Sequence, residues 1–112
     1  MGKKGVVYLL GDSENEGVYK IGVTRGDVNR RIKKLQTGNS GEIYIVKLYS
    51  TIHPFFVEAS LHRKFSSVCV LNEWYSLSSD DVKNFQAICE DIESKAETLK
   101  ENPFFKYDKL KE

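Results

Sequence analysis

Four segments of the chain have the hydrophobic patterns of β-strands. Val6–Leu10 is a short run of β-forming residues, and Val18–Val23 follows it after the polar segment Gly11–Gly17. Two such runs separated by a glycine-containing loop predict an antiparallel pair. The other two predicted strands are Glu42–Ser50 and Asn72–Leu77, and the second of these contains the only tryptophan of the chain.

Side-chain alternation sorts the residues of the first pair onto two faces. If Tyr8 pairs near Lys20, then Tyr8, Lys20 and Gly22 lie together on one face. The opposite face then holds the apolar side chains of both strands, which are Val7, Leu9, Tyr19, Ile21 and Val23. This register places a tyrosine and a lysine on the same side of the sheet.

Two helices are predicted between these strands. Asp27 is a candidate N-cap, and the apolar residues after it recur at the spacing i, i+4, i+7. These residues are Val28, Ile32 and Leu35. Pro54 suits the first position of a second helix, which is expected to extend over Phe55–Ser67.

The last helix has the most regular pattern. It begins at the acidic segment Ser79–Asp81, where negative charge favours a helix N-terminus. Its apolar stripe consists of Phe85, Ile88, Cys89, Ile92, Ala96 and Leu99, which predicts packing on the sheet without a chemical role. Residues 102–112 contain three aromatic side chains, so this tail is expected to fold back or to contact a partner.

Length and composition point to one globular domain. The 112 residues, 40% hydrophobic and 29% charged, exclude disordered, collagen-like and disulfide-scaffold proteins. The predicted organisation is a domain over residues 1–101 followed by the tail 102–112. No apolar run is long enough to cross a bilayer, so no membrane partner is expected. The two cysteines are far apart and show no metal-binding spacing, which favours an intracellular setting: the cytoplasm, a host cell or a nucleus.

Charge is distributed unevenly along the chain, although the net charge is only +1. Residues 1–79 carry 11 basic and 7 acidic groups, whereas residues 80–112 carry 6 basic and 9 acidic groups. The basic residues are densest between Lys20 and Lys34, where Asp27 is the single acidic residue. Such a local basic patch indicates either an anion-binding site or a solvated helix face.

Four polar residues have the chemistry that phosphodiester cleavage requires. Tyr8 could act as a base, because a nearby cation such as Lys20 stabilises the phenolate. Arg31 presents a planar fork for phosphate oxygens. Glu58 supplies one carboxylate, and Mg²⁺ in proteins is often held by one or two carboxylates plus water. The same residue types would also suit a phosphate-binding module without catalysis.

Five short motifs occur in an order that is known from one nuclease superfamily. They are Val7-Tyr8, Lys20-Ile21-Gly22, Arg31-Ile32 followed by Gln36–Asn39, Glu58–Phe65 with its Glu-x-x-Leu-His-x-x-Phe pattern, and Glu73-Trp74-Tyr75. With these motifs, the chain resembles the GIY-YIG nuclease superfamily, and most of all the short phage, viral and fungal branch whose second motif reads Lys-Ile-Gly. Val6 stands where the first motif has its glycine, and Lys20 stands where the superfamily has its second tyrosine.

The resemblance implies a small α+β fold in which helices flank a three-stranded antiparallel sheet. It also implies cleavage of DNA that depends on a divalent metal ion, Mg²⁺ or Mn²⁺. By analogy, Tyr8 would be the general base assisted by Lys20, Arg31 would bind the phosphate, and Glu58 would hold the metal. Four further residues are candidates for substrate binding: Arg30, Lys34, His62 and Asn72.

The alternative interpretation is a catalytically inactive module on the same fold, which would bind nucleic acid or another protein. DNA is the expected partner in the first case. A second copy of the chain or a targeting protein is a further candidate partner, and the acidic helix and aromatic tail, residues 80–101 and 104–107, are the candidate surfaces for it.

Overall fold

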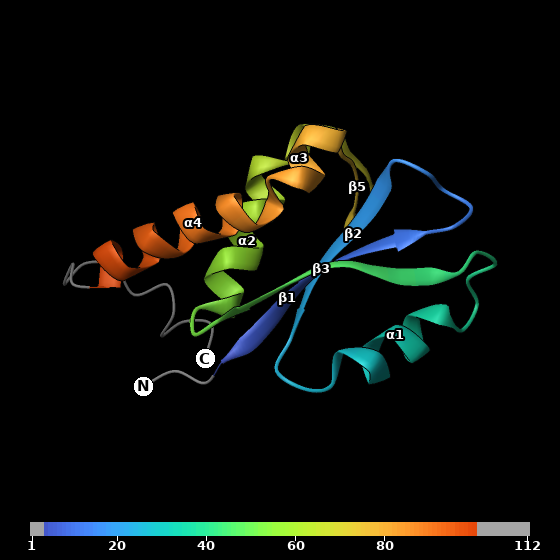
Figure 1. The fold of residues 1–112 in the computed structure, drawn as a ribbon, viewed down its shortest axis with the longest axis horizontal. Coiled ribbons are helices and arrows are strands. Elements are labelled where there is room, and N and C mark those ends of the chain that lie inside the picture. Colours follow the sequence, from blue (N-terminus) through green and yellow to red (C-terminus); the bar gives the residue numbers. More distant parts are fainter. Residues whose placement is uncertain (1–3, 101–112) are drawn as a thin grey trace.

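The computed structural model describes residues 4–100, with side chains to residue 98, and shows an antiparallel sheet with helices on both faces (Figure 1). The strands are β1 (Gly5–Asp12), β2 (Val18–Thr24), β3 (Ile43–Thr51), β4 (Cys69–Leu71) and β5 (Trp74–Ser76). The helices are α1 (Val28–Gln36), α2 (Pro54–Lys64), α3 (Ser79–Lys83) and α4 (Phe85–Lys100), with a 3₁₀ turn at Ser66–Val68. The tail 102–112 lies outside the described residues.

The α+β class is confirmed, but the sheet has five strands, in the order β3-β1-β2-β5-β4, rather than the three that the resemblance implied. The fourth strand was not predicted because Cys69–Leu71 is short and its residues are all exposed, so it has no alternating apolar pattern. A tight turn at Asn72-Glu73 returns the chain into β5, and Asn72 adopts the left-handed conformation there, with φ 54°. Short turns of this kind favour asparagine.

The predicted pairing of the first two strands is confirmed with a different register. Tyr8 lies opposite Gly22, and Leu10 lies opposite Lys20. A shift of two residues keeps every side chain on its expected face. Tyr8, Lys20 and Gly22 therefore share one face of the sheet, as the alternation predicted.

The two faces of the sheet carry two separate apolar clusters. α2 and α4 cover one face and bury the larger cluster, which includes Val7, Leu9, Ile21, Val57, Leu61, Phe85, Cys89, Ile92 and Ala96. α1 covers the other face, where Ile32 and Leu35 pack against Tyr8, Leu10 and Ile43. Within residues 4–100, no helix combines the length and the apolar character that a membrane span needs.

The predicted helix boundaries are confirmed at α1 and only in part elsewhere. Asp27 caps α1 by accepting a hydrogen bond from the backbone of Asn29 at 2.9 Å. The last helix is divided in two: Ser78 forms a capping box with Asp81 and begins the short α3, and α4 starts after Asn84. Cys89 is a free, buried thiol, and burial raises its pKa to about 12, which agrees with a packing role.

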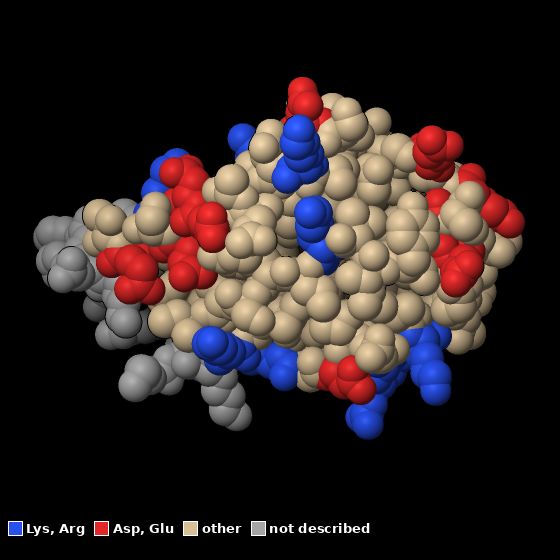
Figure 2. All heavy atoms as spheres, viewed as in Figure 1, with Lys and Arg blue, Asp and Glu red and all other residues tan. Residues whose placement is uncertain are grey.

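Charged side chains gather in separate regions of the face that Figure 2 shows. Lysine and arginine side chains gather along the edge formed by α1, while aspartate and glutamate gather over α4 and at the loop between β1 and β2. The exposed basic residues of α1 are Arg30, Arg31, Lys33 and Lys34. An anionic polymer is attracted to the first region and repelled by the second, so the α1 side is the favoured side for contact with a polyanion.

Asp12 connects the loop between β1 and β2 to the segment between α1 and β3. Its carboxylate is buried and accepts hydrogen bonds from the backbone of Glu14 at 3.0 Å, from Asn15 Nδ2 at 2.9 Å and from Asn39 Nδ2 at 3.3 Å. These bonds, the one from Glu14 first, lower the pKa of Asp12 below its usual 3.8. The ionised carboxylate therefore stabilises the fold above the pKa of the unfolded chain, and this stabilisation is lost as the pH falls through the lower, folded pKa.

We expect Asp12→Ala to lower the free energy of unfolding at pH 7 by about 1–3 kcal/mol, because buried hydrogen bonds to a charged group are lost. Urea denaturation at pH 7 and pH 3 measures this effect. The difference between wild type and variant should shrink at the lower pH. An equal difference at both pH values would show that the charge of Asp12 does not stabilise the fold.

Candidate functional site

The site forms along β2, at the point where its pairing with β5 ends. β5 pairs with β2 from Val18 to Lys20, and the backbone N–H of Ile21 donates to the carbonyl of Glu73 at 3.1 Å. α2 lies against β2 from the other side, where His62 Nε2 donates to the carbonyl of Ile21 at 3.1 Å. Residues from both faces of the sheet therefore meet at the middle of this strand.

Tyr8 and Arg31 form a contact on the α1 face. The ring of Tyr8 is buried against Gly22, where a Cβ atom would lie 2.5 Å from Tyr8 Cε1. Its hydroxyl oxygen accepts a hydrogen bond from Arg31 Nε at 3.3 Å. This bond, and more weakly the charges of Glu73 and Glu58, raise the pKa of Arg31, so the exposed guanidinium stays charged. The phenol oxygen of the buried Tyr8 is thus bound by a permanent cation.

Lys20 lies on the same face, but its ammonium group contacts a carboxylate rather than the tyrosine. Its Nζ atom donates to Glu73 Oε1 at 3.0 Å and lies 5.8 Å from the centre of the Trp74 ring. The Lys20 residue is 8% exposed. A lysine so buried is usually paired with an opposite charge, and Glu73 supplies that charge.

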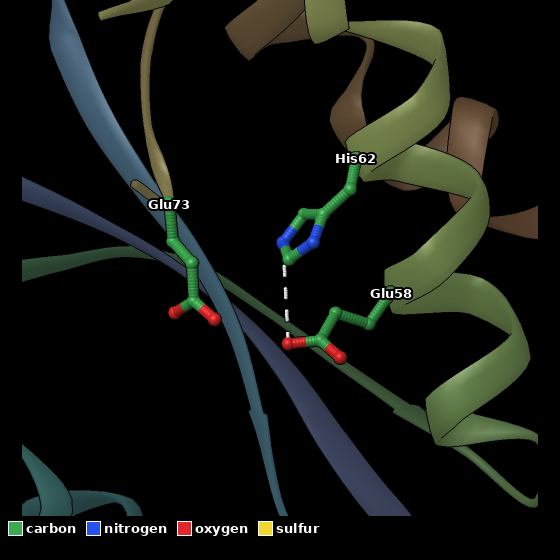
Figure 3. Close-up of side chains that lie close together, drawn as sticks. All are labelled: Glu58, His62 and Glu73. Carbon is green, nitrogen blue, oxygen red and sulfur yellow. Dashed lines mark ion pairs between the residues drawn. The ribbon is translucent and has the colours of Figure 1, made fainter. Parts of the chain in front are cut away.

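Glu58, His62 and Glu73 form a cluster on the other side of β2 (Figure 3). Glu58 and His62 are one turn apart on α2, with His62 Nε2 4.0 Å from Glu58 Oε2. One potential ligand atom from each of the three residues lies within 4.8 Å of the others. Two carboxylates and an imidazole at this separation can bind a divalent cation.

Local sequence explains how α2 presents this pair. Val57 and Leu61 are fully buried in the core, and Glu58 and His62 are the next residue after each of them. The pair therefore lies one step around the helix, at the border of the core and toward β2. The ring of His62 also stacks on Tyr75, with 5.5 Å between ring centres, which fixes the orientation of its imidazole.

The sequence model of the T5orf172 domain matches residues 5–92 of the chain. The chain belongs to the T5orf172 domain family. This domain occurs in phage and fungal proteins and has a nuclease-like, GIY-YIG-related association, but no model specific to the GIY-YIG superfamily matched. No curated protein and no solved structure matches the chain significantly.

The T5orf172 match covers every residue of the site, from Tyr8 to Glu73. It supports a nuclease or DNA-related function and a nucleic-acid partner. It carries no assignment of individual residues, and the roles of Tyr8, Lys20, Arg31 and Glu58 therefore stay predictions, as does the choice of Mg²⁺ or Mn²⁺.

The T5orf172 fold brings most of the predicted site residues together. Tyr8 bonds to Arg31, Glu58 neighbours His62, and Lys20 connects to the cluster through Glu73. Sequence reasoning did not assign Glu73 to the site, although it is the first residue of the Glu73-Trp74-Tyr75 motif. The feature that could have identified Glu73 is its position immediately before β5, the strand that pairs with β2 at Lys20.

The remaining predicted residues lie around this centre. Arg30 and Lys34 are exposed on α1, on the basic side of the T5orf172 domain. Asn72 is exposed in the β4–β5 turn, next to Glu73, and its backbone carbonyl accepts a hydrogen bond from Cys69 Sγ at 3.1 Å. The left-handed backbone of Asn72 gives it a structural function in the turn, and substrate binding by these three residues stays a prediction.

Proposed function

We propose that the chain is a divalent-metal-dependent endonuclease that hydrolyses phosphodiester bonds of DNA. The observation that carries this proposal is the arrangement around β2. On the α1 face, a tyrosine hydroxyl is bound by an arginine, and on the other side of β2 a glutamate–histidine pair meets a second glutamate. The basic helix α1 flanks the tyrosine–arginine half of the site, so a DNA backbone that follows α1 reaches Arg31.

Glu58 is the residue that we assign to hold the cation. Its carboxylate is half-buried and lies within 4.8 Å of two other groups able to bind a metal ion, so the residues present fit a divalent cation. When bound, Mg²⁺ or Mn²⁺ supplies Lewis-acid stabilisation of the negative charge on a phosphoryl oxygen.

Phosphate binding is assigned to Arg31, and proton transfer is assigned to Tyr8. Arg31 uses Nε for Tyr8, so the outer nitrogens of its exposed fork face solvent and can bind phosphate oxygens. Tyr8, whose hydroxyl is bound by this guanidinium, is the group that takes a proton from the attacking water. The water oxygen bonds to phosphorus, the bond to the leaving oxygen breaks, and that oxygen takes a proton from solvent.

A catalytically inactive nucleic-acid-binding or protein-interaction module is the second candidate. The ion pair of Lys20 with Glu73 favours it, because an ammonium group bound to a carboxylate is not directed at Tyr8. Binding by the basic surface of α1 requires no proton transfer and would persist without any cation.

Cleavage assays separate the two candidates. Plasmid, single-stranded and branched DNA are incubated with the protein in Mg²⁺, in Mn²⁺ and in EDTA, and binding is measured in parallel over a series of salt concentrations. The proposal predicts products only in the presence of metal. Salt-dependent binding with no cleavage of any substrate in either metal would contradict the nuclease and support the module.

We expect Arg31→Ala to reduce the rate of cleavage by about 10²–10³-fold, since one group that stabilises transition-state charge is removed. Single-turnover kinetics at saturating protein measure this loss apart from binding. Arg63→Ala is the matched control, because Arg63 is exposed on α2 and its guanidinium donates to Ser60 Oγ at 3.3 Å, outside the site. Equal rates for the two variants would remove Arg31 from the catalytic assignment.

A further inference from the structure

The carboxylate of Glu73 lies between Lys20 and the Glu58–His62 pair, which are far apart in the sequence. One oxygen, Oε1, accepts a hydrogen bond from Lys20 Nζ at 3.0 Å. The same residue offers a ligand atom within 4.8 Å of those of Glu58 and His62. Its side chain is 42% exposed, so the carboxylate is open to ions from solvent while its partners are more buried.

We propose that Glu73 is a second carboxylate ligand of the divalent cation, and that the ammonium group of Lys20 competes electrostatically with this cation. The inference deepens the proposed function, on which it rests for the assignment of Glu58 to the metal. It adds a ligand set of Glu58, Glu73 and His62, and it gives Lys20 a positioning function that acts through Glu73.

A single residue of β2 holds two of these ligands in place. The backbone N–H of Ile21 donates to the carbonyl of Glu73, and the carbonyl of Ile21 accepts the proton of His62 Nε2, each at 3.1 Å. A backbone carbonyl only accepts, so Nε2 is the donor of this bond. This bond fixes the orientation of the imidazole, whose Nε2 lies 4.0 Å from Glu58 Oε2.

The charges of the cluster explain why Lys20 and a cation act against each other. Two carboxylates lie close together, and Lys20 compensates one of these negative charges. A divalent cation placed between Glu58 and Glu73 is attracted by both carboxylates and repelled by the ammonium group. If Lys20 loses its charge, Glu73 is left without its counter-ion and the cation becomes its replacement.

The competition can be measured without DNA. The whole chain is titrated with Mn²⁺ alone, and electron paramagnetic resonance monitors the binding and gives the Kd for Mn²⁺. We expect Glu73→Gln to raise the Kd for Mn²⁺ by about 10-fold or more, since loss even of a supporting group of a metal site costs 10–100-fold. We expect Lys20→Met to lower the Kd by about 3- to 10-fold, because repulsion between like charges disappears. Glu16→Gln and Lys83→Met change exposed residues of the same types elsewhere and should leave the Kd unchanged.

Melting temperatures measured without metal check that both variants are folded. The Glu73→Gln substitution keeps the backbone hydrogen bond between Ile21 and residue 73, because this bond does not involve the side chain. A wild-type Kd in Glu73→Gln would overturn the inference, as would an unchanged or raised Kd in Lys20→Met. The results also distinguish failure of this inference from failure of the proposed nuclease function. If Glu58→Gln abolishes cleavage while Glu73→Gln binds Mn²⁺ normally, the nuclease stands and this inference falls. If both carboxylates bind Mn²⁺ but no DNA is cut, the inference stands and the nuclease falls.

Discussion

Glu58→Gln should reduce metal-dependent cleavage by about 10³-fold or more while the protein still binds DNA. The substitution keeps the shape of the side chain and removes the charge that holds the cation, so the Lewis-acid contribution of several kcal/mol is lost. DNA binding is expected to persist, because it depends on the exposed basic residues of α1, such as Arg30 and Lys34. The measurement is single-turnover cleavage in Mg²⁺, with binding measured in the same buffer.

Glu16→Gln is the matched control for this variant. Glu16 is exposed in the loop between β1 and β2, so its substitution changes the net charge equally without touching the site. The control should cleave as wild type does. Cleavage by Glu58→Gln at the rate of the control would contradict the assignment of the metal to Glu58.

Gly22→Ala should damage the site without changing any charged group. Gly22 lies directly opposite Tyr8, and a Cβ atom would overlap the ring of this buried tyrosine. Tyr8 must then move, which disturbs its bond to Arg31. We expect a loss of about 1–3 kcal/mol in the free energy of unfolding, as is typical of overpacking, and a fall in cleavage of about 10²-fold, since a displacement near 1 Å can cost this much.

Gly26→Ala tests whether this effect is local. The nearest atom to a Cβ at Gly26 is Thr24 Oγ1 at 3.6 Å, which is an ordinary contact, so stability and cleavage should stay close to those of wild type. Urea denaturation and single-turnover cleavage measure both variants. Wild-type cleavage by Gly22→Ala would show that the position of Tyr8 does not matter.

The elements with strong periodicity were predictable from the sequence. β1, β2, β3 and α1 follow runs or spacings of apolar residues, and the face shared by Tyr8 and Gly22 followed from alternation alone. β4 was not predictable, because its exposed three residues form a strand only through pairing with β5. The break at Asn84 between α3 and α4 was also hidden, since the apolar stripe of α4 begins immediately after it.

The candidate site was predictable as a set of residue types but not as a set of contacts. Tyr8, Arg31 and Glu58 stand out as polar residues beside apolar ones, and the structure brings them around one strand. The partner of Lys20 could not be predicted, because Glu73 is 53 positions away along the chain and reaches Lys20 only through the β2–β5 pairing. The β2–β5 pairing starts at Trp74, one residue after Glu73, and therefore positions the side chain of Glu73.

We propose that one site along β2 holds both a divalent cation and the scissile phosphate. A crystal of Tyr8→Phe with a short DNA duplex and Mn²⁺ tests it most directly, since loss of the proposed base preserves uncleaved DNA and Mn²⁺ is identified by its anomalous scattering. We predict a Mn²⁺ peak bound by the carboxylate of Glu58 and a phosphate in contact with the guanidinium of Arg31. A Mn²⁺ ion away from Glu58, or a duplex bound elsewhere than along α1 and β2, would contradict the account.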